Sequence, residues 1–176
     1  MKKALILQGW YQKTTSSFYP WLKKTLEEKG YEVYLPDLPT MHTDLPDMSE
    51  QLKFIEKNLP LDEETIIVGH SIGCLLAMRL TEKHKLGKLF LIAGWDFNDL
   101  FPNHRLFWPD AIDHQKVIEN TQKIYCISSD NDPYITAFTV EQMSKRLNGE
   151  FILIKDAGHF TDEFNIKQIL ELEQYF

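Results

Sequence analysis

The sequence contains little cysteine, and this scarcity limits the kinds of protein it can be. Only two cysteines, Cys74 and Cys126, occur among 176 residues. They have neither the spacing of a metal site nor the density of a disulfide framework. We therefore expect a reduced, cytoplasmic protein without a metal centre.

A surplus of positive charge and a long apolar run are also missing. The 26 acidic residues outnumber the 19 basic ones and give a formal net charge of −7, which argues against a nucleic-acid or anionic-membrane partner. The apolar run after the N-terminal lysines breaks at Gln8, so it predicts a first strand rather than a signal peptide. No segment approaches the roughly 20 apolar residues that cross a bilayer.

Phosphate-binding loops are absent as well. Neither a G-x-G-x-x-G pattern nor a P-loop lysine occurs, and no set of His, Asp and Glu has metal-ligand spacing. The chain shows no repeat, low-complexity tract or linker. With 43% hydrophobic residues it has an ordinary globular composition. We expect a single domain over residues 1–176 that uses no cofactor.

What the chain does have is an alternation of short apolar runs and amphipathic helical patterns. The runs are too short for helices and suit buried strands. The expected strands are 4–7, 31–36, 65–68, 88–93, 123–128 and 150–154. The expected helices begin after Ser16 or Ser17, at Ser49, at 72, near 112, at Thr139 with a capping box to Gln142, and at 163. This order predicts an α/β fold, a three-layer α/β/α sandwich around a six-stranded parallel sheet.

The stretch IIVGHSIGC (66–74) places Ser71 where a buried strand turns into a helix. In the nucleophile elbow G-x-S-x-G, the serine projects above the sheet, and close backbone neighbours leave room only for very small residues at positions two before and two after it. Gly69 and Gly73 fill those positions. The alternative is that Ser71 only caps the helix and that the glycines serve a tight turn.

A base and an acid that could activate Ser71 follow later strands. His159 is the histidine that comes directly after a strand and downstream of the other candidates, whereas His42, His84, His104 and His114 are expected at the surface. We expect a structural role for His70, with its side chain turned away from the catalytic face. We expect the acid to be Asp132; Asp130, from the same loop, and Asp96, after the fourth strand, are the alternatives. Ser, Asp and His then occur in the chain order of α/β-hydrolases.

Acyl transfer also needs N–H donors for the oxyanion. The backbone N–H of Ile72, directly after the serine, is one candidate. The loop after the first strand supplies the other: Gly9 allows close approach, and Trp10 carries the donor, with the side chain of Gln8 as an alternative.

The order LQGW, TIIVGHSIGCLLAMRL, SSDNDPYI and DAGHF resembles the small serine hydrolases related to retinoblastoma-binding protein 9 over essentially the whole chain. This resemblance implies a minimal α/β-hydrolase fold, and it maps the catalytic residues onto Ser71, Asp132 and His159. The Leu-x-Cys-x-Glu stretch linked to retinoblastoma binding is absent, so no such partner is implied.

The aromatic stretch 94–110 is the candidate pocket wall. Trp95, Phe97, Phe101, Phe107 and Trp108 could line an acyl site or anchor an irregular crossover to the core. Because the stretch is too short for a large cap, we expect an open site suited to small substrates. Together with Ser71, Asp132 and His159, this predicts a serine hydrolase that cleaves small esters or amides through an acyl-enzyme. The alternative function is a non-catalytic binding protein that docks a partner through 94–110.

Overall fold

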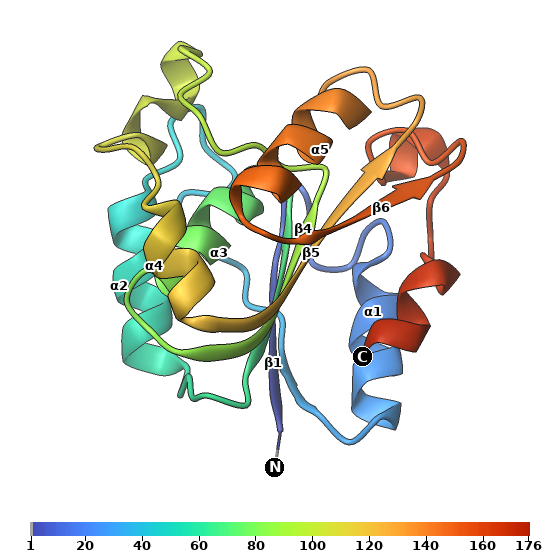
Figure 1. Ribbon diagram of the computed structural model, residues 1–176, viewed down its shortest axis with the longest axis horizontal. Helices are drawn as coiled ribbons and strands as arrows, with labels where there is room; N and C mark the ends of the chain where they lie inside the picture. The colour runs from blue at the N-terminus through green and yellow to red at the C-terminus, as the bar shows by residue number, and fades with distance from the viewer. Residues whose placement is uncertain (1) are drawn as a thin grey trace.

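The computed structural model describes residues 2–176, and within them one all-parallel sheet forms the centre of the molecule (Figure 1). The strand order is β2-β1-β3-β4-β5-β6. The strands are β1 (Lys3–Leu7), β2 (Glu32–Tyr34), β3 (Ile66–His70), β4 (Leu86–Ile92), β5 (Thr121–Ser129) and β6 (Glu150–Ile154). The prediction of a six-stranded parallel sheet is confirmed.

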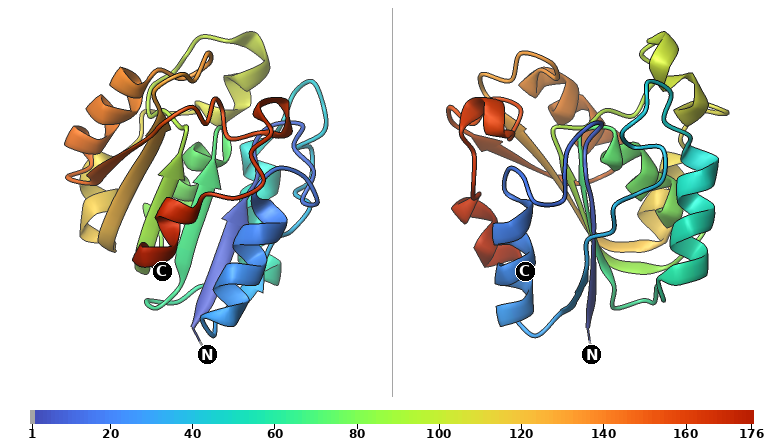
Figure 2. Two further views of the ribbon diagram at one scale, coloured as in Figure 1. Left: turned by 90° about the vertical axis from the view of Figure 1, so that its right-hand side faces the viewer. Right: turned by 180° about the vertical axis from the view of Figure 1, so that it is seen from behind.

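Helices cover both faces of this sheet, as Figure 2 shows. One face carries α2 (Met48–Asn58), α3 (Gly73–Thr81), α4 (His114–Glu119) and α5 (Ala137–Arg146). The other face carries α1 (Tyr19–Glu28) and the C-terminal 3₁₀ helix η3 (Leu170–Tyr175). Two further 3₁₀ turns, η1 (Pro102–Phe107) and η2 (Asp162–Phe164), lie in loops. The predicted three-layer arrangement is therefore present.

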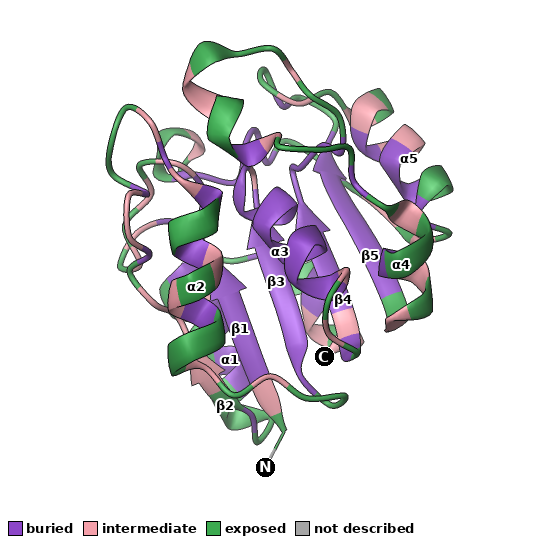
Figure 3. Cartoon of the chain, turned by 90° about the vertical axis from the view of Figure 1, so that its left-hand side faces the viewer, coloured by how far each residue is buried: buried purple, intermediate pink, exposed green. Residues whose placement is uncertain are grey.

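The core is divided by the sheet, because successive side chains of a strand point to opposite faces. Leu5 and Leu7 of β1 pack toward α2 and α3, whereas Ala4 and Ile6 pack toward α1. All four are fully buried. Figure 3 shows β1, β3 and α3 buried along most of their length, which explains why these segments are apolar without alternation.

Three predicted helix boundaries were wrong. The helix expected from Thr139 begins at Ala137, and its cap is the Thr136 side chain, which accepts a hydrogen bond from the Thr139 N–H. The helix expected from Ser49 is capped by Asp47. Neither Ser16 nor Ser17 caps α1. For α2 and α5 a neighbouring side chain with the same hydrogen-bonding ability occupies the cap position, whereas Phe18 precedes α1 and no side chain caps that helix.

The expected helix over 163–175 is not continuous. It consists of the two 3₁₀ segments η2 and η3, and Asn165 between them adopts a left-handed conformation with φ of 57°. Ile169 and Leu172 still bury their side chains against α1. Among the described residues, none of the helices has the length and apolar character that a bilayer crossing requires.

Candidate active site

Ser71 occupies a strained turn between β3 and α3. Its φ is 54°, in the left-handed region that non-glycine residues seldom adopt. The Ser71 N–H donates to the carbonyl of Ile92, and its own carbonyl accepts from the N–H of Cys74, which fixes both sides of the turn. The turn therefore lifts the serine side chain above the carboxyl end of β3.

The two glycines of the motif are required by close backbone contacts. A Cβ atom at Gly69 would lie 2.7 Å from the carbonyl oxygen of Gly73, and one at Gly73 would lie 2.5 Å from the carbonyl oxygen of Leu7. Both distances are shorter than real Cβ contacts, and the neighbours are backbone atoms that cannot move aside. The close packing of α3 against β1 and β3 thus explains the G-x-S-x-G spacing.

Ser71, His159 and Asp132 are hydrogen-bonded in series. The Nε2 atom of His159 lies 3.0 Å from Oγ of Ser71, and its Nδ1 lies 2.8 Å from Oδ2 of Asp132. The Asp132 side chain is fully buried. Its other oxygen accepts hydrogen bonds from the backbone N–H groups of Tyr134 and Ile135, at 2.8 and 3.1 Å. These bonds stabilise a charged carboxylate in a buried position.

The two alternative acids make other contacts. Asp130 accepts from the backbone N–H of Asp156 and ties the loop after β5 to the loop after β6. Asp96 has a fully buried carboxylate and binds the guanidinium of Arg146 through two hydrogen bonds of 2.7 and 2.6 Å. Its Oδ2 also lies 2.7 Å from Nε2 of His114. Asp132 is the aspartate that reaches His159.

The loop after β1 approaches the serine closely. A Cβ atom at Gly9 would lie 3.2 Å from Cβ of Ser71. Within residues 2–176, the backbone N–H groups of Trp10 and Ile72 donate to no protein acceptor, and both residues line the cavity around Ser71. The Gln8 side chain is fully buried, its amide atoms have no partner in this part of the chain, and it does not line the cavity.

His70 joins this loop to the loop that carries His159. Its Nε2 lies 2.9 Å from the carbonyl oxygen of His159, so Nε2–H donates and Nδ1 is left to accept from the Tyr19 hydroxyl at 2.6 Å. The Tyr19 oxygen accepts from the Gly9 N–H at 3.0 Å. Burial lowers the pKa of His70 to about 3, which keeps the ring neutral. Only its neutral form makes this chain of bonds, so His70 has a structural position, although its ring also lines the cavity.

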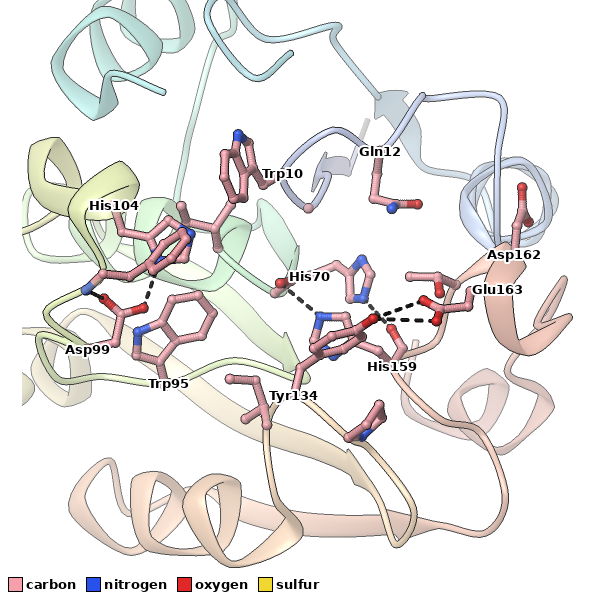
Figure 4. A pocket seen from close by; sticks show the side chains of 17 residues that line it. Trp10, Gln12, His70, Trp95, Asp99, His104, Tyr134, His159, Asp162 and Glu163 are labelled. Carbon is pink, nitrogen blue, oxygen red and sulfur yellow. Dashed lines mark hydrogen bonds and ion pairs between the residues drawn. The ribbon is translucent and has the colours of Figure 1, made fainter. Parts of the chain in front are cut away.

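A cavity of about 740 Å³ surrounds Ser71 and His159 (Figure 4). Of the aromatic residues expected in its wall, Trp95 and Phe101 line it. Phe107 is instead buried in the core, Phe97 is 49% exposed, and Trp108 packs beside the core. The irregular backbone of 94–110 has no periodicity from which these directions could be predicted. Trp10, Tyr134 and Ile135 complete the apolar part of the wall.

The other histidines occupy different environments. His42 lies beside Asp37 and His84 beside Glu56, both partly exposed as expected. His104 departs from the expectation of a surface residue, because its side chain is only 12% exposed and lines the cavity. No group of three or more His, Cys, Asp or Glu side chains that could hold a metal ion occurs in the described part of the chain.

The sheet order and the strained serine turn, with no large cap within residues 2–176, define a small α/β-hydrolase fold. The chain matches the Serine hydrolase family over residues 4–173, and it belongs to that family. It is 29% identical over 151 residues to the serine hydrolase RBBP9 of Rattus norvegicus, covering 84% of this chain and 80% of the relative.

Solved structures show the same fold. The ydeN gene product of Bacillus subtilis superposes with a TM-score of 0.86 at 23% identity, with 99% of this chain and 96% of that chain covered. Est1E of Butyrivibrio proteoclasticus, in a structure with bound ferulic acid, superposes with a TM-score of 0.74 at 15% identity, covering 92% and 82% of the two chains.

Proposed function

We propose that the protein hydrolyses small esters or amides through an acyl-enzyme, with Ser71, His159 and Asp132 as a catalytic triad. The observation that carries this proposal is the continuous series of hydrogen bonds from Ser71 Oγ to His159 and on to the buried Asp132. A serine hydroxyl becomes a competent nucleophile when a base accepts its proton and a third group orients that base.

In the acylation step, Ser71 Oγ attacks the substrate carbonyl while His159 Nε2 accepts the hydroxyl proton. Asp132 holds the Nδ1–H of the ring and stabilises the imidazolium that forms. The unpartnered N–H groups of Ile72 and Trp10 stabilise the oxyanion, and the Ile72 donor benefits from its position at the N-terminus of α3. His159 then returns the proton to the leaving alcohol or amine.

In the deacylation step, a water molecule repeats this sequence from the same side. His159 removes a proton from the water, which attacks the acyl-enzyme carbonyl, and then returns the proton to Ser71 Oγ as the acid departs. The chemistry needs no metal or cofactor. Because triad members act together, loss of one removes most of the rate that all three provide.

The substrate is a small molecule with an apolar acyl group. Trp10, Trp95 and Phe101 form an aromatic part of the wall, and the cavity volume of about 740 Å³ is in the range of small-molecule sites. Est1E, which has the same fold, binds ferulic acid, a flat aromatic acid, and this supports the proposal that the cavity accepts aromatic acyl groups.

The test is hydrolysis of p-nitrophenyl acetate by the wild type and by Ser71→Ala. We expect kcat/KM of the variant to fall by about 10³-fold or more, with an unchanged far-UV circular dichroism spectrum. Matched activity of the two proteins would contradict the proposal. It would favour a role for the fold in binding a partner rather than in catalysis.

A further inference from the structure

A second histidine–carboxylate pair lies in the same cavity as the proposed triad. Nδ1 of His104 lies 2.7 Å from Oδ2 of Asp99, and both residues line the cavity. In Figure 4 they lie with Trp95 on one side of His159, whereas Gln12, Asp162 and Glu163 lie on the other. Asp99 precedes η1 and His104 lies within it. In the described part of the chain, the recorded hydrogen bonds do not join either residue to Ser71, His159 or Asp132.

The pairing with Asp99 sets what the imidazole can offer to a ligand. The carboxylate only accepts, so Nδ1 must carry the proton and donate it. In the neutral ring Nε2 is then an acceptor. This Nε2 atom has no hydrogen-bond partner within residues 2–176, and it is not among the fully buried polar atoms. His104 therefore presents an unused acceptor that a ligand in the cavity can reach.

Aromatic rings surround this acceptor. The His104 ring centroid lies 5.3 Å from that of Trp10, 5.6 Å from Trp95 and 4.9 Å from Phe101. Contacts of this kind hold the imidazole in one orientation and make the adjoining space apolar and suited to a flat ring. A ligand group that enters here needs a planar apolar body and a hydrogen-bond donor near its end.

The charges that line the cavity limit which charged groups its ligand can carry. The lining contains the carboxylates of Asp99, Asp162 and Glu163 and no lysine or arginine. Asp162 is paired with Lys167, and Glu163 lies beside the Tyr134 hydroxyl. A carboxylate, phosphate or sulfate on the acyl group would meet negative potential without a partner. An anionic acyl group is therefore disfavoured, and an uncharged donor avoids the desolvation that an ammonium group would undergo among the aromatic rings.

We infer that the Asp99–His104 pair determines acyl specificity: Nε2 of His104 accepts a hydrogen bond from a phenolic hydroxyl on an aromatic acyl group. The inference rests on the proposed function, since it assigns the acyl side of that site. His104 binds the end of the substrate remote from the scissile bond, and Asp99 positions it. The corresponding substrates are esters whose aromatic acyl group carries a phenolic hydroxyl and no charged substituent.

The experiment compares two uncharged ketones that cannot be hydrolysed. The probes are 4-(4-hydroxyphenyl)butan-2-one and 4-(4-methylphenyl)butan-2-one, which differ by a hydroxyl in place of a methyl group of similar size. Dissociation constants are measured by titration calorimetry on the wild type, on His104→Phe and on the control His42→Phe. His42 is also paired with an aspartate, Asp37, but does not line the cavity.

We expect the wild type and His42→Phe to bind the phenol about fivefold to tenfold more tightly than the methyl compound, as one buried hydrogen bond provides. In His104→Phe this ratio should fall to about one. A wild-type ratio near one, or a ratio that survives in His104→Phe, would overturn the inference. The latter result would mean that His104 only anchors η1.

The same experiment separates this inference from the proposed function. Neither ketone requires cleavage, so the binding ratio can be measured even if Ser71 proves unreactive. If the wild type hydrolyses esters but binds the two ketones equally, the assigned specificity is wrong and the proposed triad is unaffected. If the wild type prefers the phenol and His104→Phe does not, while Ser71→Ala hydrolyses esters as fast as the wild type, the binding role of His104 holds and the proposed triad is wrong.

Discussion

The hydroxyl of Tyr19 lies 2.6 Å from Nδ1 of His70, and both side chains are buried beside the proposed triad. Through this bond α1 is connected to the serine turn, and His70 in turn holds the backbone carbonyl of His159. Gly9 completes the connection through its N–H. The proposed base and the proposed oxyanion loop are therefore fixed by one set of buried hydrogen bonds.

Tyr19→Phe tests how much these buried hydrogen bonds contribute to the free energy of unfolding. The substitution leaves Nδ1 of His70 and the N–H of Gly9 without their partner in a buried site, and such losses cost about 1–3 kcal/mol. We expect the free energy of unfolding, measured with urea, to fall by that amount. Tyr34→Phe is the control, because within residues 2–176 the Tyr34 hydroxyl donates to Glu32 alone, at the surface, and it should change stability by less than about 0.5 kcal/mol. Equal losses for the two substitutions would show that the buried bonds of Tyr19 stabilise the fold no more than the surface bond of Tyr34 does.

His70 should also make the protein sensitive to acid. Burial lowers its pKa to about 3 in the folded protein, whereas an unfolded histidine has a pKa of about 6.5. Between these values the unfolded chain binds the proton and the folded protein does not. Stability contributed by the neutral ring is therefore complete above about pH 6.5 and decreases as the pH falls toward 3, by up to about 1.4 kcal/mol per pH unit.

Urea unfolding of the wild type and of His70→Gln between pH 4 and pH 7 measures this slope. The variant has no imidazole at this position, so its free energy of unfolding should depend less on pH than that of the wild type. Parallel pH dependences in the two proteins would assign the acid sensitivity to other groups.

A comparison of the two neighbouring aspartates tests the proposed acid. Asp132→Asn removes the acceptor for Nδ1–H of His159, and the wrong imidazole tautomer should lower kcat by up to about 10⁴-fold. Asp130→Asn affects only the bond to the Asp156 N–H and should lower kcat far less. Steady-state kinetics with p-nitrophenyl acetate give both values, and a reversal of the two losses would identify Asp130 as the acid.

Much of the fold followed from local patterns. Buried parallel strands give short continuous apolar runs, and the elbow has a fixed glycine spacing because backbone atoms touch there, so 65–68 and Ser71 were both recognisable. The distinction between Asp132 and Asp130 was harder. Both residues lie in one loop, and their different partners, His159 and the Asp156 N–H, come from another loop that sequence spacing cannot place.

The wall of the cavity could be predicted only in part. Residues 94–110 form no regular element apart from η1, so nothing periodic indicates that Trp95 and Phe101 face the cavity while Phe107 enters the core. The position of His104 depends on Asp99 and on Trp10, which comes from the loop after β1. Likewise, the bond between Tyr19 and His70 joins residues 51 positions apart that carry no shared motif.

The length of the acyl chain is a further test of the open site. No large cap roofs the cavity, and its apolar wall consists of few residues, so long chains gain little binding energy beyond the wall. We expect kcat/KM for p-nitrophenyl esters to be highest for acetate or butyrate and to decline beyond about eight carbons. A series from two to sixteen carbons provides the measurement. An optimum at twelve carbons or longer would mean that a deep acyl tunnel opens in solution.

The central claim is that Ser71 is a nucleophile activated by His159 and Asp132. It is tested most directly by reaction with a fluorophosphonate probe, followed by mass spectrometry of the digested protein. We predict one phosphonylated site, at Ser71, with no labelling of folded Ser71→Ala and strongly slowed labelling of His159→Ala. Labelling of Ser71→Ala at the wild-type rate, or no labelling of the folded wild type, would contradict the account.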